Sequence, residues 1–203
     1  MERVPGETAI IDGKLKAWKR YLLEYDLPTW EEIPDIGLYM DQVISLLDTY
    51  FDYLAPDIKG NPFATKAMIN NYVQAGVVPL SVKKRYYRTH LAYIIIVCLL
   101  KQSLSIGQIS EALPVDLPED ELHRIYDRFV ELRRQSAQYF CSEARELVAM
   151  LRGEDSKNDV LDIGNVDDLI IAVAIIGGYS VLLAQKLTDE TCGLYGGGAS
   201  DDR

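Results

Sequence analysis

The chain has 203 residues, of which 48% are hydrophobic and 26% charged, enough for one large or two small domains with a sizeable core. This composition is typical of a globular protein and excludes the collagen-like, low-complexity and largely disordered classes. The 31 acidic and 21 basic side chains give a net charge of −10, which taken alone argues against a protein that binds polyanions.

The three cysteines, Cys98, Cys141 and Cys192, lie far apart and form no Cys-x-x-Cys pair, so neither a zinc site nor a disulfide framework is expected. The N-terminus lacks the apolar core of a signal peptide. The uncharged run 169–184 has 16 residues, whereas a membrane span needs roughly 18–20. We therefore expect a cytoplasmic protein with reduced thiols, without a metal, a cofactor or a membrane contact.

Apolar side chains recur at steps of three and four residues along most of the chain, a pattern that predicts amphipathic helices. Helices are expected over about residues 15–25, 35–54, 65–75, 91–103, 105–113, 118–151 and 166–187. Between the third and fourth of these, the run Val77–Val82 and the pair Tyr86-Tyr87 predict a small β-hairpin, or wing. The predicted fold is all-α with one small β element.

Four residues mark the ends of these helices. Thr65 is placed to cap the third helix, and Gly76 follows its last turn, where glycine ends helices. Ser105 is expected to start the short helix that runs to residue 113. Pro118, followed by three acidic residues, starts the long helix, because proline suits the first turn and acidic side chains complement the helix dipole.

The charges are distributed very unevenly along the chain. Between Lys59 and Ser110 there are seven basic residues and no acidic one, although about eight acidic residues would be expected there from their frequency. The rest of the chain carries the other 14 basic and all 31 acidic residues, a net charge of −17. A surface without acidic residues suits the approach of phosphates. The alternative is a basic head that docks on the acidic remainder of the chain or of a dimer.

This basic segment contains motifs in a characteristic order. Residues 68–72 read Met-Ile-Asn-Asn-Tyr, and after three residues 76–79 read Gly-Val-Val-Pro; Lys84–Tyr87 and the box Ser-Ile-Gly-Gln-Ile at 105–109 follow. They resemble the recognition helix, wing and next helix of the MerR family of winged helix-turn-helix regulators. The resemblance implies a MerR-like domain that reads double-stranded DNA, with Asn70 and Asn71 where the family has Arg and Tyr.

The whole chain also resembles a bacterial family of unknown function, DUF1836. The residues that carry this resemblance are Leu27–Trp30, Tyr39–Val43 and Met68–Tyr72. It implies no established activity, so it supports the fold and leaves the function open.

The residues expected to bind DNA lie on the predicted recognition helix and the wing. The asparagine amide fits the major-groove edge of adenine, and lysine and arginine around two tyrosines suit phosphate contacts. These residues are Thr65, Lys66, Asn70, Asn71, Gln74, Lys83, Lys84, Arg85, Tyr86, Tyr87, Arg88 and His90. The alternatives are a helix cap or core hydrogen bond for the asparagines, a solvated turn for the basic residues, and a plain helix start for His90.

Helix-turn-helix proteins usually read DNA as dimers, and the helices predicted over 118–151 and 166–187 are the material for a dimer interface. The alternative for these helices is packing within one chain. The expected organisation is an N-terminal arm (1–34), a MerR-like domain (35–113), a helical half for dimerisation or an effector (114–188) and a tail (189–203).

No motif of an enzyme is present: the chain has no Walker loop, no G-x-G-x-x-G, no G-x-S-x-G and no H-E-x-x-H. His123 has no partner at a defined spacing and is expected at a surface or interface. The sequence thus predicts a bacterial transcription regulator that binds double-stranded DNA as a homodimer, with no effector defined. The alternative is a protein–protein interaction adaptor that uses the same scaffold without DNA.

Overall fold

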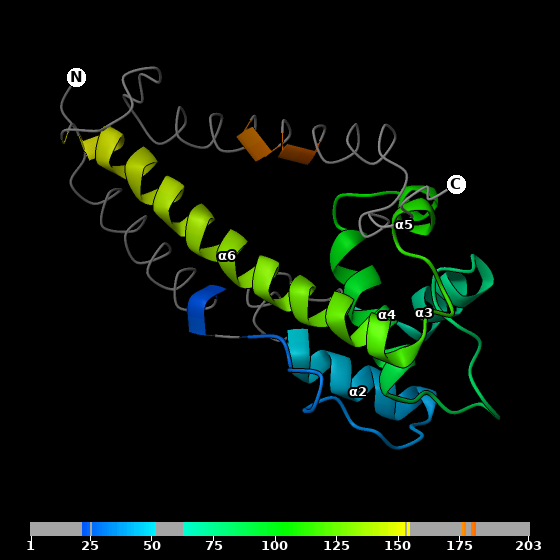
Figure 1. Cartoon of the computed structure of the whole chain (residues 1–203). Coiled ribbons are helices and arrows are strands. Elements are labelled where there is room, and N and C mark those ends of the chain that lie inside the picture. Colours follow the sequence, from blue (N-terminus) through cyan, green and yellow to red (C-terminus); the bar gives the residue numbers. More distant parts are fainter. Residues whose placement is uncertain are drawn as a thin grey trace, which may run out of the picture. The chain divides into compact units, whose positions relative to one another are not determined.

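The computed structural model describes residues 22–24, 26–51, 63–152, 154, 176–177 and 180–181. This part of the chain is mostly helical, as predicted (Figure 1). Its labelled helices are α2 (Met40–Phe51), α3 (Lys66–Gln74), α4 (Arg88–Leu100), α5 (Ile106–Ala112) and α6 (Glu119–Arg152). Most of the helices predicted over 15–25 and 166–187, and the whole tail, lie outside the described residues.

The described residues belong to two compact units. One contains Val181 and those between Leu27 and Val130, and the other contains those between Glu131 and Ser180 together with Asp26 and the residues before it. α6 contributes its first turns to one unit and the remainder to the other. The predicted domain boundaries at 34, 113 and 188 stay predictions.

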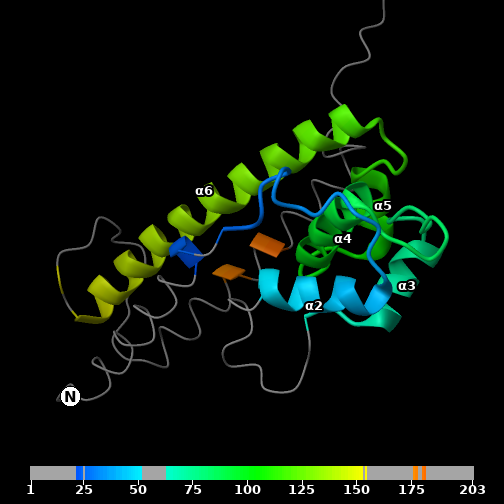
Figure 2. The ribbon, with the colours of Figure 1, turned by 90° about the horizontal axis from the view of Figure 1, so that it is seen from below.

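The core of the Leu27–Val130 unit is built on α4. Residues Leu91–Cys98 are all buried, because this helix is apolar on every side and such a helix is stable only when enclosed. α2 and α3 contact one another, and both views show α2 to α5 gathered together (Figures 1 and 2). The other helices contribute buried side chains, which include Val43, Leu47, Ile69, Tyr72, Ile109, Leu122 and Tyr126.

The loop before α2 is fixed to the first turns of α6. The hydroxyl of the fully buried Tyr126 donates a hydrogen bond to the carbonyl oxygen of Pro28 at 2.8 Å. The ring of His123 stacks on buried Trp30 with 4.8 Å between ring centroids, and its Nε2 lies 3.2 Å from a carboxylate oxygen of Asp127. His123 is thus partly buried against the loop rather than free on the surface.

The four residues predicted to mark helix ends do so, although α4 ends at Leu100 and not near residue 103. The Thr65 hydroxyl accepts a hydrogen bond from the Met68 amide at 3.1 Å, and Ser105 caps α5 in the same way. Gly76 follows α3 with a φ of +71°, a left-handed conformation that glycine adopts without strain. α6 begins at Glu119, directly after Pro118.

The helix predicted to begin at Asp35 begins instead at Met40. Residues before it are extended, because the amide and carbonyl of Leu38 exchange hydrogen bonds of 2.8 Å with those of Tyr86. This pairing and an isolated bridge between Val82 and Arg85 are the β-structure of the described residues. The predicted hairpin is therefore reduced to one tight turn.

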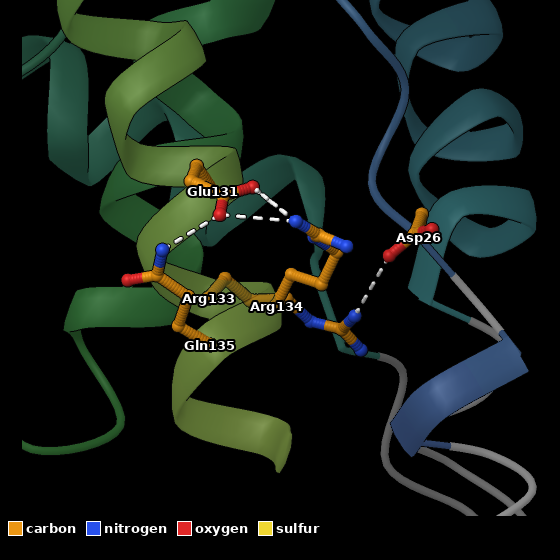
Figure 3. A network of polar contacts seen from close by, with 5 residues as sticks. All are labelled: Asp26, Glu131, Arg133, Arg134 and Gln135. Carbon is orange, nitrogen blue, oxygen red and sulfur yellow. Dashed lines mark hydrogen bonds and ion pairs between the residues drawn. The ribbon is translucent and has the colours of Figure 1, made fainter. Parts of the chain in front are cut away.

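The second unit contains α6 from Glu131 onward. Glu131 binds two side chains of the following turn, with Arg134 nitrogens at 2.9–3.1 Å and Gln135 Nε2 at 2.7 Å (Figure 3). Arg133 lies 3.6 Å from a carboxylate oxygen of Asp26 (Figure 3). Over the described ranges, no helix is long and apolar enough to cross a membrane.

Candidate nucleic-acid interface

α3 has one buried and one exposed face. Ile69 and Tyr72 are buried and anchor the helix in the core. Burial raises the pKa of Tyr72 to about 12, so its hydroxyl stays neutral at physiological pH. The exposed positions recur at steps of three and four residues and therefore lie on one side of the helix. They are Lys66, Ala67, Asn70, Asn71, Gln74 and Ala75.

The three amide side chains of this face are available to a ligand. In the described part of the chain, Asn70, Asn71 and Gln74 make no hydrogen bond through their side chains, so neither asparagine caps a helix or bonds within the core there. Lys66 forms an exposed ion pair with Asp41 of α2. The face thus combines uncommitted donors and acceptors with two alanines, whose small side chains allow close approach.

A tight turn follows α3. Val82 and Arg85 exchange two backbone hydrogen bonds of 3.0 Å, and the two residues between them, Lys83 and Lys84, have φ values of 51° and 63°. Left-handed backbone in both central positions is typical of a type I′ turn, which favours Asn-Gly. Each lysine is therefore strained by roughly 1–2 kcal/mol. Both lysines are exposed, and in both views the connection between α3 and α4 runs along the outside of the unit beside α3 (Figures 1 and 2).

Arg85 is exposed but already bound within the unit. Its guanidinium donates hydrogen bonds to the carbonyl oxygen of Gly37 at 3.0 Å and to the hydroxyl of Tyr39 at 2.9 Å. It also lies 4.5 Å from the centroid of the Tyr39 ring, within the range of a cation–π contact. This side chain fixes the turn to the segment before α2.

Tyr86 and His90 are buried and hold the same region together. His90 Nδ1 accepts a hydrogen bond from the Tyr87 amide at 3.2 Å, and Nε2 lies 3.0 Å from the carbonyl oxygen of Leu80. Both contacts are satisfied when the neutral ring carries its proton on Nε2. Tyr86 packs edge-on against the His90 ring with 5.8 Å between centroids. Tyr87 is only partly exposed.

Arg88 joins the start of α4 to the loop before α2. Its Nε donates a hydrogen bond to the carbonyl oxygen of Ile33 at 3.0 Å, and its Nη1 lies 3.9 Å from an Asp35 carboxylate oxygen. The guanidinium also lies 5.9 Å from the centroid of the Trp30 ring. Its side chain is mostly buried by these contacts.

The structure therefore divides the twelve predicted residues into two sets. Six side chains face solvent, on α3 and in the turn: Lys66, Asn70, Asn71, Gln74, Lys83 and Lys84. We call these six, with Ala67 and Ala75, the α3–turn surface. The other six cap a helix or bind other parts of the unit: Thr65, Arg85, Tyr86, Tyr87, Arg88 and His90.

Two features of this surface were not predicted from the sequence. Ala67 and Ala75 share the helical spacing of the asparagines, and that spacing alone could have indicated them. The ion pair of Lys66 with Asp41 joins two separate helices, and no local sequence pattern predicts it. Over the described ranges, no group of three His, Cys, Asp or Glu side chains could hold a metal ion.

Comparison with known protein families identifies the family of the chain. The sequence profile of a family described as "Domain of unknown function (DUF1836)" matches residues 28–129, which is half of the chain. The matched segment contains α2 to α5 and the first turns of α6. No curated protein and no solved structure matches the chain.

Proposed function

Since the chain belongs to the DUF1836 family, whose description assigns no activity, we propose from its own surface that it binds double-stranded DNA. The observation that carries the proposal is the outward face of α3. It presents three amides without hydrogen bonds to the described residues, in a stretch of 52 residues that contains no acidic side chain.

In this proposal α3 enters the major groove, which accommodates one α-helix. Asn70, Asn71 and Gln74 present donor and acceptor pairs to base edges, a pattern that suits adenine. Ala67 and Ala75 let the helix backbone approach the groove walls. α2 and α3 then act as a MerR-like helix-turn-helix, in keeping with the contact between them.

The turn after α3 acts as the wing and binds phosphates. Lys83 and Lys84 are exposed at its tip, where ammonium groups reach a DNA backbone. Their left-handed backbone supports this role, because exposed strain of this kind persists at functional positions. Arg85 and His90 hold the turn in place rather than contacting DNA.

We further propose that the protein binds as a homodimer through α6. Beyond Glu131, one side of this helix packs inward with Ala137 and Val148, while Leu132, Tyr139 and Phe140 are exposed. Leu132 and Tyr139 are seven residues apart, the spacing that aligns apolar side chains between two paired helices. A second copy of the chain is the partner that covers them, and two copies present two reading heads to DNA.

Fluorescence anisotropy with a labelled duplex of random genomic sequence at 50 mM salt tests the proposal. We expect binding by the wild type, and binding at least tenfold weaker for Lys83→Ala/Lys84→Ala. The variant Asn70→Ala/Asn71→Ala tests in the same assay whether the amides of α3 contribute to DNA binding. The matched control, Arg124→Ala/Arg128→Ala, removes two exposed charges from α6 and should bind like the wild type.

Absence of binding by a folded wild type at 50 mM salt would refute the proposal. Equal loss in the control variant would also refute it, because binding would then follow total charge rather than this surface. An adaptor that binds a protein through the same scaffold is the alternative that such a result would favour.

A further inference from the structure

Three short segments form a small β arrangement beside the turn. The isolated bridges place Leu38 opposite Tyr86 and Val82 opposite Arg85. Side chains of extended backbone alternate between its two sides, and residues opposite one another point to the same side. Leu38 and Tyr86 therefore share one face, and Val82 and Arg85 share the other. Leu38 and Tyr86 point inward and are buried. The opposite side, which we call the outer β face, consists of Gly37, Tyr39, Leu80, Val82, Arg85 and Tyr87.

Contacts among these side chains agree with this register. Arg85 binds both the Gly37 carbonyl and the Tyr39 hydroxyl, so it lies across the segment before α2. A Cβ atom on Gly37 would lie 2.8 Å from Arg85 Cδ and 3.0 Å from Tyr87 Cζ, which shows how closely the segments pack there. The outer β face is therefore formed in advance rather than assembled by a partner.

The outer β face exposes a large amount of apolar surface. Leu80 is 79% exposed, Val82 52%, Tyr39 50% and Tyr87 36%. Exposed apolar groups on one face, with polar groups beside them, are typical of interaction sites. Nothing in the packing of the described unit requires Leu80 or Val82 to be apolar, because neither side chain is buried there.

Its composition favours a protein as the partner over nucleic acid. Tyrosine and arginine are enriched at the centre of protein interfaces, where lysine, aspartate and glutamate are depleted. The outer β face contains two tyrosines, one arginine and two aliphatic residues, and none of the depleted types. The lysines that suit phosphate are not part of this face and lie beside it, at the tip of the turn.

The charge of this face indicates what the partner carries. A guanidinium has five N–H groups, and two of those of Arg85 are bound to Gly37 and Tyr39, which leaves three for a partner. Lys83 and Lys84 add positive charge next to it. A carboxylate is the group that matches this donor set.

We propose that the outer β face binds a short extended protein segment that presents apolar side chains and a carboxylate on one side. The proposal is independent of DNA binding, because α3 and the two lysines at the tip of the turn are not part of this face. It gives the protein a second surface, through which a partner protein attaches.

The test is an NMR titration of the ¹⁵N-labelled full chain with the peptide acetyl-Leu-Ser-Asp-Ser-Leu-Ser-Phe-amide. Every second residue of an extended peptide lies on one side, so its leucines, aspartate and phenylalanine face the protein together. We expect saturable shifts at the amides of Leu80, Val82 and Tyr87, with a Kd of about 1 mM or below. Matched peptides with alanine for leucine and phenylalanine, or lysine for aspartate, should bind at least tenfold more weakly.

The variant Leu80→Ser should lose these shifts, keep a dispersed spectrum and bind duplex DNA like the wild type. Tyr139→Ser, on α6, should keep the shifts. Two results would overturn the proposal: no saturable shift at millimolar peptide, or equal binding of the alanine peptide. Failure of DNA binding alone would leave this proposal standing.

Discussion

The strained turn between α3 and α4 gives the sharpest prediction, because stability and DNA binding should change in opposite directions. Lys83 and Lys84 occupy left-handed backbone with φ of 51° and 63°. In Lys83→Asn/Lys84→Gly, both residues become the types that a type I′ turn favours. The same change removes two exposed positive charges.

The expected gain in stability follows from the two backbone angles. Relief of left-handed strain is worth roughly 1–2 kcal/mol per residue for a side chain such as lysine. Glycine lowers this gain by about 0.5–1 kcal/mol, because it makes the unfolded chain more flexible. Asparagine keeps part of the strain. We therefore expect a net gain of ~1–2 kcal/mol, which raises the Tm of a protein of this size by about 2–8 °C.

Urea unfolding and thermal melts measure the stability, and duplex anisotropy at 0.1 M salt measures the binding. Two lost phosphate contacts should weaken DNA binding roughly tenfold or more. Lys83→Ala/Lys84→Ala is the control, because it removes the same charges but keeps non-glycine residues in the strained positions. A variant that is no more stable than this control would contradict the assigned strain, and one that binds DNA like the wild type would contradict the role of the turn.

Three further predictions concern single side chains. Asp41→Asn frees Lys66 from its ion pair, so duplex DNA should bind roughly two- to fivefold more tightly in the anisotropy assay. Tyr126→Phe leaves the Pro28 carbonyl without its buried hydrogen bond, and urea unfolding should show a loss of about 1–3 kcal/mol. Burial raises the pKa of Cys98 to about 12, so at pH 8 about one molecule in ten thousand carries the thiolate, and mass spectrometry should find it unmodified by iodoacetamide in the folded protein.

Each of these has a matched control. Asp48→Asn removes a different exposed carboxylate of α2 and should leave DNA binding unchanged. Tyr139→Phe, at an exposed position, should change the stability by less than about 0.5 kcal/mol. In urea Cys98 should react readily. Tighter DNA binding by both asparagine variants would contradict the role of the Lys66 ion pair. Equal losses of stability in both tyrosine variants would contradict the contribution of the Tyr126 hydrogen bond. Rapid alkylation of Cys98 in the folded protein would contradict its raised pKa.

The sequence predicts the helices of the central unit well, because their signals are local. Thr65 and Ser105 act as caps within three residues of the amides they bind, and the apolar run of α4 is buried as its composition requires. The start of α2 was wrong by five residues. Leu38 is drawn into extended backbone by Tyr86, which is 48 positions away in the chain.

Contacts between residues far apart in the chain also explain why the sequence predicted only part of the candidate site. Arg85, Arg88 and His90 look like phosphate ligands beside two lysines. Their actual partners include Gly37 and Ile33, which lie 48 and 55 residues earlier. Only long-range packing separates the basic side chains that hold the turn from those that face solvent, and a local pattern does not contain that information.

The salt dependence of duplex binding measures whether the α3–turn surface binds phosphates. The slope of log K against log salt should be steep for the wild type and smaller by about 1.8 per bound protomer for Lys83→Ala/Lys84→Ala, since each phosphate contact contributes about 0.9. Arg124→Ala/Arg128→Ala should keep the wild-type slope. If the wild type and the lysine variant have identical slopes, or if the wild-type slope is near zero, this surface does not bind phosphates.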